Sequence, residues 1–208
     1  QVSSLVCSHT DVLVLTFVCG LRTVSIYSMY ATIYGMVGNL ISIISGSVQS
    51  ALGQIYNNDR KRFIELHDAY ETCFLALVFG LFAIASIFML PFMELYTKCA
   101  DINYIDWKLP VLFTAYQLLN YGRTPSHNPI GFAGKFKETQ WRAWLETTIN
   151  LVVSFICVFQ FGIYGVLFGT IAALLYRAND IIIYANKIVL GRSPWPTYRR
   201  WLINLGVF

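Results

Sequence analysis

Charged residues are scarce in this 208-residue chain, and their scarcity excludes an ordinary soluble domain. Asp, Glu, Lys and Arg make up 12% of the residues, which is about half the share typical of soluble domains. Hydrophobic residues make up 56% and aromatic residues 16%. The composition therefore predicts an integral membrane protein.

The chain also lacks the motifs of the common catalytic and metal sites. Its five cysteines are isolated, and no CxxC or Cys/His cluster occurs. The phosphate-binding loop GxxxxGK[ST] and the motifs GxSxG and HExxH are missing, as are carboxylates paired as hydrolysis requires. We therefore expect no enzyme activity, no metal, no cofactor and no nucleic-acid partner.

Six apolar segments are long enough to cross a bilayer, whose ~30 Å core takes about 20 helical residues. They cover residues 2–18, 24–55, 70–90, 109–131, 143–161 and 162–190. The sequence thus predicts an all-α, six-helix transmembrane bundle over residues 1–190. Residues 191–208 are expected to form a cytoplasmic link and the start of a further helix. Both ends of the chain are apolar, so we expect a piece of a longer protein.

Basic residues gather in alternate loops of this bundle. The basic-rich loops carry Arg60, Lys61, Arg62, Lys135, Lys137, Arg142, Lys187, Arg192, Arg199 and Arg200. The loops between them hold only Arg22, Lys98 and Lys108. Because Lys and Arg are retained on the cytoplasmic side of a membrane, we expect a multi-pass protein whose basic-rich loops face the cytoplasm.

The segment 24–55 carries its aromatic and small residues on one side. At about 100° per residue, Tyr27, Tyr30 and Tyr34 fall on this side, and the opposite side is aliphatic. The aliphatic side suits lipid. The tyrosine side suits either close packing against another helix or the wall of a water-filled cavity, and the sequence leaves both interpretations open.

The segment 109–131 is expected to be broken. Pro125 and Pro129 each remove a backbone donor, and irregular backbone at membrane depth is tolerated where it faces protein or a cavity. Counted at ~1.5 Å per residue from the outer face, Arg123 lies in the cytoplasmic half of the bilayer. It either faces the interior or ends the helix at the inner headgroups. His127, one turn later, is more typical of a hydrogen-bonded structural residue.

A stripe of polar residues begins just before the segment 143–161 and runs along it. Its members are Thr139, Arg142, Glu146, Asn150 and Ser154. Their helical spacing places them on one face. Arg142 and Glu146 are i,i+4 neighbours that can pair, whereas the amide of Asn150 lies deeper and needs another partner.

Small residues spaced four apart open the segment 162–190. They are Gly165, Gly169 and Ala173. This pattern favours close packing of helix backbones in a membrane. Further along, Arg177 returns to the cytoplasmic half, so Arg123, Glu146 and Arg177 are predicted to share one depth. Arginines beside a broken membrane helix favour the binding and movement of an anion.

Several motifs occur in a characteristic order. They are TDVLVLT around Asp11, VSIYSMYATIY from Val24, SALGQ from Ser50, LPFMELYT from Leu90 followed by Asn103-Tyr104, and the polar and glycine positions from Gly134 to Thr170. In their order and spacing these motifs resemble bacterial polysaccharide flippases of the O-antigen and teichoic-acid type. These flippases belong to the superfamily of multidrug, oligosaccharidyl-lipid and polysaccharide exporters. The resemblance covers nearly the whole chain.

The resemblance implies a function as well as a fold. It implies the C-terminal lobe of a two-lobe protein, whose N-terminal lobe is missing here. Such flippases move undecaprenyl-pyrophosphate-linked oligosaccharides across the bacterial cytoplasmic (inner) membrane by alternating access. The pyrophosphate would give Arg123 and Arg177 a partner, because a guanidinium matches phosphate oxygens.

The other candidate binding residues follow the same interpretation. Glu146, Asn150 and Asp11 are the remaining polar candidates, and Tyr27, Tyr30 and Tyr34 would stack on sugar. Two other functions stay open. A drug or cation exporter of the same superfamily would use the carboxylates of Asp11 and Glu146, and a membrane-embedded transferase would use His127 or Glu146.

Overall fold

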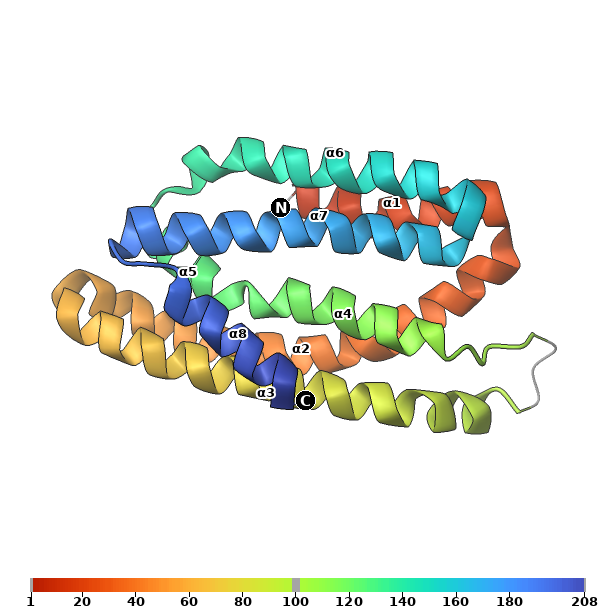
Figure 1. The fold of residues 1–208 in the computed structure, drawn as a ribbon, viewed down its shortest axis with the longest axis horizontal. Helices are drawn as coiled ribbons and strands as arrows, with labels where there is room; N and C mark the ends of the chain where they lie inside the picture. The colour runs from red at the N-terminus through yellow and green to blue at the C-terminus, as the bar shows by residue number, and fades with distance from the viewer. Residues whose placement is uncertain (1, 99–101, 208) are drawn as a thin grey trace.

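The computed structural model describes residues 2–98 and 102–207, which are helical over most of their length and contain no strand (Figure 1). The helices are α1 (Val2–Cys19), α2 (Leu21–Asn58), α3 (Arg60–Tyr96), α4 (Lys108–Gly122), α5 (Thr124–Phe132), α6 (Phe136–Phe161), α7 (Ile163–Tyr184), the π-helix η1 (Ala185–Leu190) and α8 (Trp195–Val207). By length and composition, four stretches are able to cross a membrane, namely α2, α3, α6 and Ile163–Leu190. The predictions of an all-α fold and of membrane helices are therefore confirmed.

The division into six membrane helices is not confirmed. The expected segment 109–131 is divided at Arg123 into α4 and α5, and α8 adds a helix after the last expected segment. Helix α3 also begins ten residues before the expected segment 70–90, since hydropathy detects apolar stretches rather than helix ends. Its polar first turn is helical because the carboxylate of Asp59 accepts the backbone N–H groups of Lys61 and Arg62 at 3.0 Å.

Helix α3 also continues past the expected end, through Pro91 to Tyr96. Proline lacks the backbone N–H that a helix interior needs, which is why the expected segment stops at residue 90. Pro91 is exposed. Membrane helices tolerate an internal proline because local adjustments satisfy the freed carbonyl.

The helices form an elongated bundle in which α4 lies between two groups (Figure 1). Helices α1, α6 and α7 contact one another on one side of α4, and α2 and α3 contact each other on the other side. The main apolar core fills the space around α4, where Phe113 is completely buried. Helix α8 crosses the outside of α3.

The loops rich in basic residues meet at one end of the bundle. That end holds the α2–α3 turn, α5 with the start of α6, and the link between η1 and α8 (Figure 1). The opposite end holds the α1–α2 turn, the start of α4 and the α6–α7 turn. The chain thus separates basic-rich loops from basic-poor loops, as expected of a protein that crosses a membrane in one orientation.

Helices α6 and α7 form the closest helix pair. The turn between them is made at Gly162, whose φ of +57° is strained for any residue with a side chain. A Cβ atom at Gly165 would lie 2.3 Å from the carbonyl oxygen of Cys157, and one at Gly169 would lie 2.6 Å from the backbone N of Ser154. The two glycines therefore allow the backbones to approach each other directly.

Replacing Gly165 with alanine should weaken this hairpin. The added methyl group would meet the backbone of α6, which cannot move aside without separating the two helices. We expect the free energy of unfolding in detergent to fall by about 1–3 kcal/mol, the usual cost of overpacking. Gly46→Ala is the matched control, because a Cβ there meets nothing within 4 Å. Equal unfolding midpoints for the two variants would contradict the prediction.

Candidate functional site

Five charged side chains form one continuous arrangement near the basic-rich end, called here the arginine network. Its members are Arg123, Arg142, Glu146, Arg177 and Asp180. The carboxylate of Glu146 accepts Nη1 of Arg123 at 2.7 Å and lies 3.4 Å from Nε of Arg177. The carboxylate of Asp180 accepts Nη1 of Arg177 at 2.9 Å and Nη1 of Arg142 at 2.5 Å. The chain of contacts thus alternates arginine and carboxylate.

The network carries surplus positive charge. Three guanidinium groups face two carboxylates, which leaves a formal charge of +1. The side chain of Arg177 is 7% exposed and forms the centre, whereas Arg123 and Arg142 are 20% and 23% exposed and form the ends. Nε of Arg142 is buried without a hydrogen-bond partner. The network therefore contains one more positive charge than its carboxylates balance.

Backbone features bring the network together. Arg123 lies at the junction of α4 and α5, and Asn120 accepts its Nη2 at 3.2 Å. Glu146 on α6 reaches Arg177 because the glycines of α7 let the two helices approach closely. Arg123, Glu146 and Arg177, which the sequence predicts to share one depth, contact one another through the carboxylate of Glu146.

The possible pair of Arg142 with Glu146 does not form. Arg142 instead binds Asp180 of α7, and its guanidinium lies 4.9 Å from the ring centre of Tyr184. Both oxygens of Glu146 are used by Arg123 and Arg177. Neighbours four residues apart on a helix pair only weakly, so partners on adjacent helices replace that contact.

A second polar group lies deeper in the bundle and is called here the Asp11 centre. Asp11 is 4% exposed, and its Oδ2 accepts the hydroxyl groups of Tyr27 at 3.1 Å and Thr170 at 2.9 Å. Asn150 donates to Thr170 at 3.1 Å, and Ser154 donates to Asn150 at 3.4 Å. Oδ1 of Asp11 has no hydrogen-bond partner, and no basic side chain of the described residues forms an ion pair with this carboxylate. The amide of Asn150, by contrast, has the hydrogen-bond partner that the sequence analysis expected it to need, namely Thr170.

The three tyrosines of α2 lie in a packed interface rather than along an open cavity. Tyr27, Tyr30 and Tyr34 are 7%, 0% and 0% exposed. Their rings lie 5.3, 5.8 and 5.6 Å from the ring of Phe113 on α4. The hydroxyl groups of Tyr30 and Tyr34 donate to backbone carbonyls at 2.8 and 2.9 Å. Of the two interpretations of this side of α2, packing is the one that the structure favours.

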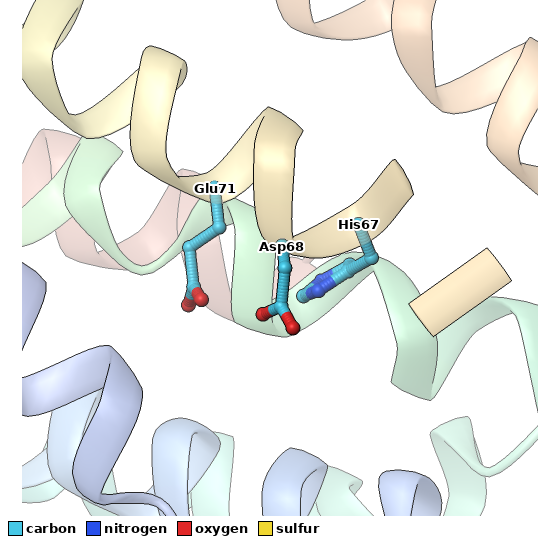
Figure 2. Close-up of side chains that lie close together, drawn as sticks. All are labelled: His67, Asp68 and Glu71. Carbon is cyan, nitrogen blue, oxygen red and sulfur yellow. The ribbon is translucent and has the colours of Figure 1, made fainter. Parts of the chain in front are cut away.

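A group of ionisable residues that the sequence analysis missed lies at the start of α3. Figure 2 shows His67, Asp68 and Glu71 projecting from one side of this helix. One ligand atom from each lies within 4.8 Å of the others, and these residue types are able to bind a metal ion. Glu71 is 1% exposed and His67 is 1% exposed. Nε2 of His67 lies 3.0 Å from the carbonyl oxygen of Pro125 on α5.

The two carboxylates of this group are already paired with arginines. Asp68 accepts Arg192 at 2.7 Å and Arg200 at 2.9 Å. Glu71 also accepts Arg200, together with the hydroxyl of Thr197 at 2.8 Å. Two carboxylates balance two guanidinium groups, so a divalent ion would have to displace both arginines. We call this group, with Arg192 and Arg200, the α3–α8 junction and assign it to the docking of α8.

No protein family, curated protein or solved structure matches this chain. The relationship to flippases therefore remains a prediction from the sequence.

Proposed function

We propose that this chain is one lobe of a flippase that moves lipid-linked oligosaccharide across the bacterial cytoplasmic membrane. The surplus positive charge of the arginine network, held within a bundle of membrane-length helices, is the observation that carries the proposal. Charged residues at such positions are costly and usually serve a functional site. An anion is the ligand that a network of charge +1 favours.

The chemistry of the network fits a pyrophosphate headgroup. A guanidinium donates two parallel hydrogen bonds to phosphate oxygens as readily as to a carboxylate. Arg123, whose side chain is 20% exposed, can therefore exchange Glu146 for a phosphate without losing charge-assisted hydrogen bonds. Such an exchange makes both binding and release possible, because neither state leaves a buried charge unpaired.

The position of the network agrees with the direction of transport. It lies toward the end that collects the basic loops, which is the cytoplasmic end by the distribution of Lys and Arg. Substrate that enters from the cytoplasmic leaflet would meet the arginines first. In this proposal, a second lobe would supply the opposite wall of the transport path. The proposal is tested by measuring surface polysaccharide in cells whose full-length protein carries Arg123→Ala. We expect these cells to lose the polysaccharide.

A cation-coupled exporter of the same superfamily is the second candidate, and Asp11 favours it. Its buried carboxylate has one oxygen without a hydrogen-bond partner and is surrounded by neutral donors. A carboxylate in such surroundings favours the binding of a proton or a cation. The arginine network argues against a cationic cargo, so this candidate assigns Asp11 to coupling.

Replacing Asp11 with asparagine tests the second candidate. Asparagine keeps an oxygen for the hydroxyl groups of Tyr27 and Thr170 and removes the charge. We expect the free energy of unfolding to rise, because the variant removes a buried charge that no basic side chain of the described residues pairs with. If Asp11 binds a proton or Na⁺, the unfolding midpoint of the wild-type protein should depend on its concentration, and that of the variant should not. The same dependence in both proteins would contradict coupling at Asp11.

A further inference from the structure

The break between α4 and α5, which carries Arg123, leaves one backbone carbonyl without its helical donor. In an α-helix the carbonyl of Pro125 would accept the N–H group of residue 129, but that residue is Pro129 and has no N–H. Pro125 is buried, and a buried carbonyl without a partner costs about as much free energy as a lost hydrogen bond. A donor from outside α5 is therefore favoured here.

His67 of α3 supplies such a donor. Its Nε2 lies 3.0 Å from the carbonyl oxygen of Pro125, and because a carbonyl only accepts, Nε2 donates. The side chain is 1% exposed, and its ring lies 5.6 Å from that of Phe63, one turn earlier on the same helix. The hydrogen bond therefore ties α3 to the first turn of α5, two residues after Arg123.

Helix α8 contacts the residue on the other side of Arg123. That residue, Gly122, is buried, and a Cβ atom there would lie 2.4 Å from the ring of Trp201. The indole of Trp201 therefore packs directly against the backbone of α4. The α3–α8 junction joins this contact to the one made by α3, because Asp68 of α3 pairs with Arg200 of α8 at 2.9 Å. Each of these two charged residues is the direct neighbour of a side chain that contacts the break.

We propose that the α3–α8 junction positions Arg123 by holding the backbone on both sides of it, with His67 as the donor and Trp201 as the packing contact. Arg123 reaches Glu146 at 2.7 Å from a point where the helix is interrupted, so the direction of its side chain depends on these contacts. A movement of α8 would thus be transmitted to the arginine network. The positioning itself is independent of transport, whereas an effect on export rests on the proposed function.

Restoring the missing helical donor tests the role of His67. In Pro129→Ala, residue 129 regains an N–H group for the carbonyl of Pro125. His67→Leu should raise the unfolding equilibrium constant of the full-length protein in detergent by on the order of tenfold, because a buried acceptor loses its donor. In the Pro129→Ala background the same replacement should have a clearly smaller effect. The lost packing against Phe63 is common to both backgrounds and cancels, so equal effects would overturn the role of His67.

A second cycle measures whether Arg123 keeps its position. Arg123→Ala and Glu146→Ala each remove the contact between the two side chains, so their effects on the unfolding constant should be non-additive by about tenfold. His67→Leu should reduce this non-additivity. His67→Gln should preserve it, because the amide keeps an N–H donor. A histidine that only stabilises the fold would lower stability and leave the non-additivity unchanged.

Two tryptophans of α8 provide a matched comparison. Trp201→Ala removes the contact with Gly122 and should reduce the same non-additivity, whereas Trp195→Ala removes a ring that is 64% exposed and should not. Unchanged non-additivity in His67→Leu or in Trp201→Ala would overturn the proposal. Export is measured separately, in cells that carry Arg123→Ala. Normal export there, together with reduced non-additivity in His67→Leu, would support the positioning and contradict the proposed function.

Discussion

Cells whose full-length protein carries Arg123→Ala should lose their surface polysaccharide while keeping the protein in the membrane. Arg123 lies at the exposed end of the arginine network and is the arginine best placed to reach a headgroup. Its removal still leaves Glu146 in contact with Arg177 at 3.4 Å, so no buried carboxylate loses its last partner. A charge-assisted hydrogen bond contributes about 1.5–3 kcal/mol, which is on the order of 10- to 100-fold in headgroup affinity.

Matched variants distinguish binding from a loss of charge alone. Arg123→Lys keeps the charge but loses the planar fork, so export should fall to an intermediate level. Arg62→Ala removes an exposed arginine from the first turn of α3, outside the network, and should export normally. Arg177→Ala should also abolish export. Normal export by both Arg123→Ala and Arg177→Ala, at wild-type protein levels, would exclude the network as the anion site.

Glu146 tests whether the carboxylates hold the arginines or take part in transport. Replacing it with glutamine removes one negative charge and should raise the charge of the network from +1 to +2. If Glu146 only positions the arginines, export persists and the amount of protein in the membrane falls. If the exchange of Glu146 for phosphate is part of release, export falls while the protein level stays constant.

Apolar patterning predicts where this chain crosses a membrane more reliably than where its helices end. The expected segments 24–55, 70–90 and 143–161 lie within α2, α3 and α6, and the segment 162–190 contains α7. Their polar ends are helical for local reasons that hydropathy does not detect, as the cap at Asp59 illustrates. The two prolines after Arg123 indicated the break in the segment 109–131, because each removes a backbone donor.

The sequence predicts the membrane depth of the residues in the candidate site but not which of them form ion pairs. Helical rise alone places Arg123, Glu146 and Arg177 at one level. The choice of Asp180 as the partner of Arg142 depends on the rotation of α7 against α6, which the sequence does not contain. The tyrosines of α2 illustrate the same limit, because one helix face suits packing or a cavity equally well until its neighbour is known.

The α3–α8 junction was missed for a related reason. Asp68 and Arg192 are 124 positions apart in the chain, and no local pattern connects them. The sequence offered only a weak signal. Asp68 and Glu71 lie one helical turn apart before an apolar segment, and arginines with no obvious partner lie near the C-terminus. Charges at the border of a membrane segment ordinarily indicate only the interface. The burial of Glu71 to 1% exposure is what distinguishes this group from an interfacial pair.

Replacing Glu71 with alanine should be the most destabilising single change at this junction. Arg200 would lose the more buried of its two carboxylate partners, and the hydroxyl of Thr197 would lose its acceptor. Arg200 keeps Asp68 at 2.9 Å, so the cost is that of a lost charge-assisted hydrogen bond and an unsatisfied hydroxyl, about 1.5–3 kcal/mol. We expect a loss of this size in the free energy of unfolding, measured in detergent. Glu65→Ala, an exposed position on the same helix, is the control and should change little.

A double variant separates the loss of charge pairing from the loss of packing. Glu71→Met combined with Arg200→Met replaces both partners with apolar groups of similar length, and such replacements are often neutral. Its stability should therefore exceed that of Glu71→Ala. The ring of Trp201 lies 5.6 Å from that of Phe79. In a background whose other tryptophans are replaced by phenylalanine, the fluorescence of Trp201 reports whether α8 remains docked on α3. A shift to longer wavelength in Glu71→Ala, and its absence in the double variant, would assign the junction to docking α8, whereas equal stability of Glu71→Ala and Glu65→Ala would exclude that role.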